Sequence, residues 1–259
     1  MDNIDNYLSF AKEEIQRTYG HNVVLGRKSL HKFGRFENLG TAENDINHLG
    51  IDPLHSTTNS ITTVSSSNAS DTTQTIVIEG MTISGTDLSF TSQGVTLNGQ
   101  AKVTLTTPVS RVTRISNSIG PSPTLGAVYV YEDTAISGGI PTDLSTIGNV
   151  MSVADQSTLF AGTSVSSSNY FIMTGLWAYL GKKTNAFADI RFKTQTVGRG
   201  FYRSRVIGSI SNSSPLARII QPYLIITPNT DIDITGVGST TNIDVFAGFD
   251  GVFADIRIQ

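Results

Sequence analysis

Cysteine is absent from this sequence of 259 residues. Its absence excludes a disulfide framework, a thiolate metal ligand and a thiol nucleophile. Charged residues are scarce, at 15%, and the hydrophobic share of 38% is modest. Ser, Thr, Asn and Gly fill the difference, which is typical of β-sheet proteins with many turns. No apolar run reaches the length of a membrane span, and the amphipathic start of the chain lacks the apolar region of a signal peptide, so we expect no membrane partner.

The net charge is small, −3, with a sequence pI near 5.8, so the chain has no overall attraction to nucleic acid. Basic residues nevertheless gather in two segments. The first contains Lys12, Arg17, Arg27, Lys28, Lys32 and Arg35, and the second contains Lys182, Lys183, Arg191, Lys193, Arg199, Arg203, Arg205 and Arg218. The second segment also contains Phe187, Phe192, Phe201 and Tyr202, which raises nucleic acid or glycan as an alternative ligand. Residues 187–192 alternate apolar and charged side chains, which favours a strand face turned to solvent or to a subunit, and we expect no nucleic-acid partner.

The first segment predicts one helix followed by an extended arm. Asp2 or Asn3 can cap a helix to about Thr18, with Ile4, Leu8, Ala11 and Ile15 at helical spacing and Gly20 as the stop. Periodicity is lost over residues 21–63, so this stretch predicts an irregular arm that becomes ordered when it binds a partner. We expect residues 20–53 to be disordered before assembly.

Two antiparallel β domains are predicted after the arm, so the fold class is mainly β. The expected divisions are 1–61 (helix and docking arm), 62–135 (β domain), 136–156 (linker) and 157–259 (sandwich or jelly roll). The first β domain has expected strands at 75–78, 87–91 and 127–131, and a hairpin at 95–105 with a type I′ turn at Asn98-Gly99. The second has expected strands at 157–160, 170–180, 186–195, 201–209, 222–227, 231–235 and 241–258.

Four stretches occur together in an order that resembles a group of tailed-bacteriophage virion structural proteins. They are HKFGR at 31–35 with ENDI at 43–46, VSSSNASDTTQTIVIEGM at 64–81, VTLNGQAKVTLTTPVSRVTRI at 95–115, and NIDVFAGFDGVFADI at 242–256. The resemblance spans nearly the whole chain. It implies a non-enzymatic virion component. Among such components we favour a capsid decoration (cement) protein, a homotrimer on the capsid surface of a particle that is assembled in the host cytoplasm.

Candidate chemistry is weak throughout the chain. The four histidines (His21, His31, His48 and His55) stand on the irregular segment without the spacing of metal ligands. Asp231 and Asp233 alternate with Ile232 and Ile234, which predicts exposed carboxylates on a strand rather than the start of a calcium loop. Neither a G-x-S-x-G motif nor a Ser-His-acid arrangement is evident. We therefore expect no catalytic residue, no metal and no cofactor.

The arm carries the predicted partner-binding residues, because an aromatic ring on an irregular segment gains from burial in a neighbour and because interfaces use aromatic and Arg anchors. These residues are Arg27, Lys28, Leu30, Lys32, Phe33, Arg35 and Phe36. The expected partner is the major capsid protein or another virion protein. Two alternatives stay open: a tail or neck adaptor or fibre anchor, and a head fibre that binds a receptor or glycan. The latter would need exposed aromatic rings, whereas the apolar context of Trp177 predicts a core position.

Overall fold

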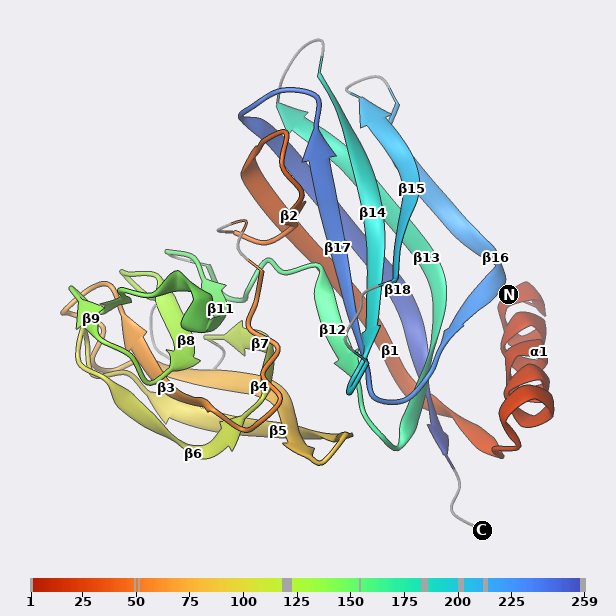
Figure 1. Cartoon of the computed structure of the whole chain (residues 1–259), viewed down its shortest axis with the longest axis horizontal. Helices are drawn as coiled ribbons and strands as arrows, with labels where there is room; N and C mark the ends of the chain where they lie inside the picture. The colour runs from red at the N-terminus through yellow and green to blue at the C-terminus, as the bar shows by residue number, and fades with distance from the viewer. Residues whose placement is uncertain are drawn as a thin grey trace.

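The computed structural model describes residues 2–48, 50, 52–117, 123–153, 155–182, 186–199, 203–211 and 214–256. It is mainly β, with one α-helix, α1 (Asp2–Tyr19), at the predicted position. Two β domains lie side by side in Figure 1, and α1 packs at the far end of the larger one. The fold-class prediction is confirmed. Among the described helices, none is long and apolar enough to span a membrane.

The larger domain is a sandwich of two antiparallel sheets. One sheet has the strand order β1-β18-β13-β16, and the other has the order β12-β17-β14-β15 with β2 beside β17. The bounds are β1 Val23–Leu39, β2 Asn44–Asp45, β12 Gly162–Val165, β13 Asn169–Lys182, β14 Phe187–Thr196, β15 Arg203–Ser211, β16 Leu216–Ile226, β17 Thr230–Gly238 and β18 Ile243–Ile256. The strand expected at 157–160 forms only isolated bridges, at Ser157 and Phe160.

The smaller domain also has two sheets, with the orders β11-β8-β3-β6 and β5-β4-β7. Their bounds are β3 Ile61–Ser66, β4 Thr75–Ser84, β5 Asp87–Thr96, β6 Val103–Val109, β7 Arg111–Ser116, β8 Val128–Glu132 and β11 Ile147–Met151. A short β9 (Ile136–Ser137), β10 (Ile140–Pro141) and the 3₁₀ turn η1 (Leu144–Thr146) connect β8 to β11. The stretch predicted as a linker, 136–156, therefore includes a strand of this domain, because β11 pairs with β8.

The predicted irregular arm is wrong over most of its first half. β1 pairs with β18 from Val23↔Ile256 to Leu39↔Ile243, and β2 adds to the other sheet of the same sandwich. The inward side of β1 carries the half-buried Leu30 and the buried Phe36 and Leu39, with Lys32 and Gly34 between Leu30 and Phe36. Because so few inward residues are apolar, the sequence of β1 lacks the alternation of apolar and polar residues that is typical of a strand. Its backbone hydrogen bonds are nevertheless made within the chain, to β18.

The predicted hairpin at 95–105 is also wrong. Val95 pairs with Ile76 on β4, whereas Val103 pairs with Val64 on β3, so the chain crosses from one sheet to the other at this turn. Gly99 has φ +58°, but Asn98 is not in the left-handed region that a type I′ turn requires of both residues. The Gly99 N–H donates to the Asp71 carbonyl at 2.7 Å, which ties the turn to a distant loop.

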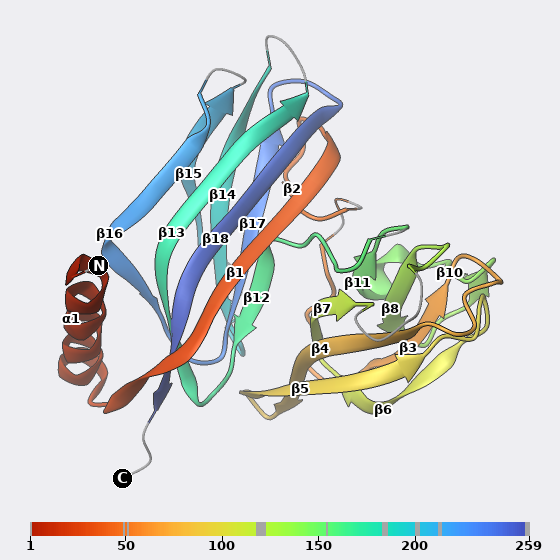
Figure 2. The same ribbon diagram turned by 180° about the vertical axis from the view of Figure 1, so that it is seen from behind.

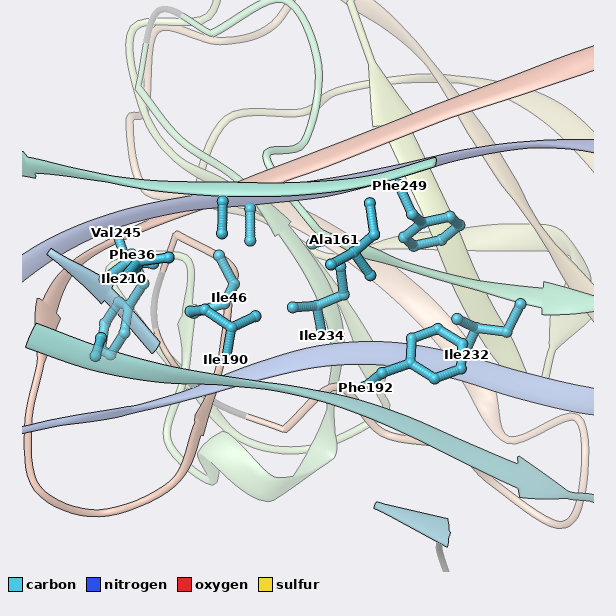
Figure 3. Packing of buried hydrophobic residues seen from close by; sticks show 14 of the residues in the cluster. Phe36, Ile46, Ala161, Ile190, Phe192, Ile210, Ile232, Ile234, Val245 and Phe249 are labelled. Carbon is cyan, nitrogen blue, oxygen red and sulfur yellow. The ribbon is translucent and has the colours of Figure 1, made fainter. Parts of the chain in front are cut away.

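The sandwich core contains inward side chains from both sheets. Figure 3 shows Phe36, Ile46, Ala161, Ile190, Phe192, Ile210, Ile232, Ile234, Val245 and Phe249 meeting between them. The prediction that Ile232 and Ile234 face a core is confirmed, since they are 0% and 1% exposed. A second core in the smaller domain contains Val95, Leu97 and Leu105 from the crossing segment.

A third cluster lies outside the sandwich. Helix α1 presents Ala11 and Ile15 to the outer face of the β1-β18-β13-β16 sheet, where they meet Tyr170, Ile172 and Ala254. The apolar residues at helical spacing thus form one buried stripe along α1. The helix covers only one end of this face, and in Figure 2 no other described element crosses the remainder.

Candidate partner interface

The uncovered part of this sheet brings together two of the motifs that the sequence singled out. In the β1–β18 register, His31 stands opposite Asp250, Phe33 opposite Gly248, and Arg35 opposite Phe246. The HKFGR segment and the C-terminal AGFD segment therefore pair directly, although they are more than two hundred residues apart. This pairing gives both motifs a structural role within one sheet.

Strand β13 extends the same outer face. Trp177 stands opposite Gly248, and Tyr179 stands opposite Phe246. Paired residues in a sheet share a face, so six side chains from three strands form one surface. We call it the aromatic strip, and it comprises His31, Phe33, Arg35, Trp177, Tyr179 and Phe246.

The rings of the strip form a continuous stack. Ring centroids are 5.9 Å apart for His31 and Trp177, 6.0 Å for Trp177 and Tyr179, and 4.6 Å for Tyr179 and Phe246, with interplanar angles of 19°, 20° and 8°. The Arg35 guanidinium lies 4.9 Å from the Phe246 centroid and ends the stack with a cation–π contact. Stacking fixes the ring orientations while Phe33 and Tyr179 each remain 43% exposed.

Carboxylates hold both ends of the strip. Arg35 donates to Asp244 through Nε at 3.1 Å and Nη2 at 2.9 Å, a bidentate pair, and also contacts Glu37 at 3.0 Å. The hydrogen bond to Asp244 raises the pKa of Arg35. At the other end, His31 Nδ1 lies in contact with the Asp250 carboxylate. The strip is therefore a pre-organised surface with a polar rim.

Two glycines make this arrangement possible. A Cβ on Gly248 would lie 2.3 Å from the Lys32 carbonyl oxygen and 2.4 Å from the Trp177 ring, which occupies the space above β18. On the inward side of β1, a Cβ on Gly34 would lie 2.0 Å from the Ile46 carbonyl oxygen and 2.6 Å from the Ala161 nitrogen. Both positions require a glycine because backbone or a fixed ring fills the space of a side chain.

The predicted docking residues divide between the two faces of β1. Phe33 and Arg35 lie on the outer face in the aromatic strip. Leu30 packs against the sandwich core, and Phe36 is a core residue with 8% exposure, so both predicted docking side chains point into the sandwich. The side chains of Arg27 and Lys28 lie outside the described part.

Lys32 instead joins the two β domains. Its Nζ donates to the Thr113 carbonyl in β7 at 2.6 Å, and burial lowers its pKa to about 8. This contact within the chain replaces the predicted contact with a partner.

Trp177 is a further correction, because it lies half-buried on the outer face rather than in the core. A bulge between Met173 and Gly175 reverses the phase of β13. Phe171 and Met173 point into the sandwich before the bulge, and Leu176 points inward after it. The odd residues that follow, Trp177 among them, then face outward. A continuous apolar run hides such a phase change.

A second polar cluster lies between the domains. Asp231 and Asp233 are 0% and 4% exposed, so the prediction that these carboxylates face solvent is wrong. The Arg111 guanidinium in β7 donates to the Asp231 carboxylate at 3.0 to 3.3 Å, and Ser164 donates to it at 2.6 Å. Burial alone would raise the pKa of Asp231, but His55 and Arg111 hold it below its usual value. The outer face of β17 is thus covered at Asp231 by β7 of the smaller domain and at Thr235 by Glu43.

The acids buried in this junction have raised pKa values. Burial and the proximity of Asp52 raise the pKa of Asp45, and burial raises the pKa of Asp233 to about 6. In the described ranges, no group of three or more His, Asp and Glu residues is arranged to hold a metal ion. Asp231 serves in this junction as the ion-pair partner of Arg111.

The histidines and the second basic segment also have structural contacts. His21 bonds the Tyr170 hydroxyl at 2.7 Å and His55 lies 3.6 Å from Asp231, so both side chains contact strands of the sandwich. Arg191 and Lys193 pair with Glu43. Lys183, Phe201, Tyr202 and the side chains of Lys182 and Arg218 lie outside the described residues.

Comparison with known proteins adds little to this picture. No protein-family profile matches the chain, and no curated protein matches it. A structure of the infectious bursal disease virus Gt strain has 12% identity and a TM-score of 0.27, covering 90% of this chain and 73% of the other. The VP2 subviral particle of the same virus has 12% identity and a TM-score of 0.24, covering 96% and 78%. At these scores the likeness carries no conclusion about fold or function.

Proposed function

We propose that the chain is a non-enzymatic virion structural protein, a capsid decoration protein that binds the major capsid protein or another virion protein through the aromatic strip. The observation that carries this proposal is the exposed, stacked surface on β1, β18 and β13. Its composition of aromatic rings and Arg with a polar rim is that of interface hot spots. The sequence resemblance to tailed-phage virion proteins, which includes both motifs of the strip, supplies the partner class.

Cementing is a physical task that suits such a surface. A packed shell is pushed outward from inside, and a rigid part that spans neighbouring subunits adds buried area to their seam. The strip lies on a long, paired strand rather than on a flexible loop, so little ordering entropy is lost on docking. A homotrimer about a threefold axis would place three strips on one capsomer and multiply the contact through avidity.

The head-fibre alternative depends on an open aromatic face for a sugar. In the stack, Trp177 has His31 and Tyr179 as neighbours, and Tyr179 has Trp177 and Phe246. Each of these rings is therefore already stacked on two sides. This geometry favours a protein partner over a sugar at the strip.

Quantitative mass spectrometry of purified particles tests the proposal. A copy number equal to that of the major shell protein, or a simple fraction such as one third, is expected of a decoration protein. A number lower by one or two orders of magnitude would contradict decoration and assign the chain to the tail or neck. Absence from the particle would overturn the virion function altogether.

A further inference from the structure

A cavity of about 370 Å³ opens at the edge of the sandwich where the two sheets separate, beside α1. Its walls come from β14, β15, β16 and the start of β17, and Figure 1 shows β15 and β16 on the same side as the helix. A volume of this size is within the range of small-molecule sites. The cavity is separate from the aromatic strip and from the junction between the domains.

Three arginines line this cavity without a carboxylate among the lining residues. Arg205 stands opposite Phe192 and Arg203 stands opposite Thr194 on β14, so both arginines share the inward face of the sheet with a core ring. Ile210, further along β15, is a core residue, whereas Arg203 and Arg205 lie at the exposed end of the strand, where the cavity opens to solvent. Within the described chain, neither guanidinium makes an ion pair or hydrogen bond, nor does that of Arg199.

The third arginine stands on a fixed turn. The Arg199 N–H donates to the Thr196 carbonyl at 3.0 Å, and the Arg199 carbonyl accepts from Gln195 Nε2 at 3.2 Å. Gly198 has φ +79°, and the Val197 N–H donates to the Asn229 carbonyl at 2.8 Å. The backbone of this turn is therefore held in place, and it presents Arg199 at the same opening as the two arginines of β15.

The remainder of the cavity has a mixed character. Phe192, Leu224 and Ile226 supply an apolar floor, and the half-exposed ring of Tyr19 lies at one wall. Thr194 and Thr227 line the sides. Guanidinium groups bind phosphate and sulfate oxygens through paired N–H donors, whereas hydroxyls and an aromatic wall suit a hydroxylated ring.

We propose that this cavity binds a small anionic sugar, a unit of monosaccharide size that carries a phosphate or sulfate ester. The ester group lies among Arg199, Arg203 and Arg205, and the sugar ring lies over the apolar floor. This site is independent of the proposed docking function, since none of its residues belongs to the aromatic strip. It gives the arginines of β15 a role other than the protection of an edge strand.

Calorimetric titration of the full chain at an ionic strength of about 20 mM, where charge is weakly screened, tests the proposal. The probes are glucose 6-sulfate, glucose 6-phosphate, glucose and inorganic sulfate. We expect one or both esters to bind, and glucose and inorganic sulfate to bind about tenfold more weakly or worse, because each lacks half of the contacts. The two ester arms identify which oxyanion is preferred.

Arg203→Gln and Arg205→Gln are each expected to weaken ester binding about tenfold or more. Arg114→Gln, at an exposed position on the other domain, is the matched control and should leave binding within about twofold. Amide chemical-shift changes at Thr194 and Thr196 in the unaltered chain locate the site independently if a variant is poorly folded. The proposal is overturned if neither ester binds, if inorganic sulfate or glucose binds as tightly as the esters, or if binding survives both substitutions.

If the two arginines only protect the edge of β15, the variants would self-associate in sedimentation experiments and the unaltered chain would bind no ester. That pair of results would likewise overturn the sugar site.

Discussion

The outer face of the β1-β18-β13-β16 sheet has two halves that differ in how their side chains are shielded from water. The half beside α1 carries Tyr170, Ile172 and Ala254, and the helix buries them with Ala11 and Ile15. The other half has no cover among the described elements. It carries stacked rings and a bidentate ion pair instead of aliphatic side chains.

The two halves differ in how stable their surfaces are when exposed to water. An aliphatic patch gains about 25 cal/mol for each Å² removed from water and is stable only when something covers it. Stacked rings bury part of their faces on one another and keep polar groups at the rim, so the surface tolerates solvent. The open half is thus stable alone and still has the composition of a binding surface.

Removing cover from the closed half should have the largest effect on stability. Ile15 is fully buried, so Ile15→Ala is expected to lower the free energy of unfolding by about 2–4 kcal/mol through lost transfer energy and a cavity. Phe10, on the same helix, is 61% exposed, and Phe10→Ala should change the unfolding energy by less than about 0.5 kcal/mol. Chemical denaturation measures both, and equal effects would contradict the burial of one helix face.

Filling the space beneath the ring stack should have the next largest effect. Gly248→Ala places a Cβ against the Lys32 carbonyl and the Trp177 ring, and we expect a loss of about 1–3 kcal/mol with a changed Trp fluorescence spectrum. Gly94→Ala is the matched control, since its Cβ would meet only a Thr75 methyl at 3.7 Å. An unchanged Trp environment in Gly248→Ala would contradict the position of the ring over β18.

The ion pair at the end of the strip should matter less. Arg35→Gln removes the partner of Asp244, which is largely buried, but the arginine is itself about a third exposed, so we expect a loss of about 1 kcal/mol. Arg114→Gln should cost less because Arg114 is exposed and donates to a hydroxyl, that of Ser157, rather than to a carboxylate. A double-mutant cycle with Asp244→Asn isolates the coupling, and additive effects would contradict the pair.

The ring surface of the open half should contribute least to folding. Tyr179→Ser is expected to lower the unfolding energy by less than about 1 kcal/mol, because the side chain is 43% exposed. The same change should weaken partner binding by about tenfold or more, as for an interface hot spot. A large stability loss with unchanged binding would reverse the comparison between the two halves.

Local patterns in the sequence predicted the helix, most strands of the sandwich and the inward direction of Ile232 and Ile234. They could not predict which distant strands pair, and two wrong predictions, the irregular arm and the hairpin at 95–105, have this cause. Residues 23–39 form a strand because β18 offers an edge, although Lys32 and Gly34 interrupt the inward apolar pattern. Asn98-Gly99 is a strong hairpin signal, but the strands on either side of it pair elsewhere, β5 with β4 and β6 with β3.

The same limit applies to the candidate surface. Phe33 and Arg35 were predicted as partner-binding residues from their chemistry, and both lie on the outer face, Phe33 exposed and Arg35 partly buried. Trp177, Tyr179 and Phe246 were missed because their exposure depends on a bulge in β13 and on where α1 ends. Asp231 was expected in solvent because periodicity distinguishes the two faces of a strand but not whether a second domain covers one of them.

Binding of the purified protein to particles assembled without it tests the central claim most directly. The Phe33→Ser, Tyr179→Ser double variant removes two exposed rings of the strip, and Phe90→Ser removes a ring that is 56% exposed on the smaller domain. We expect the double variant to bind about tenfold more weakly or worse, and Phe90→Ser to bind like the unaltered protein. Unchanged binding of the double variant, with its folding intact, would contradict the account.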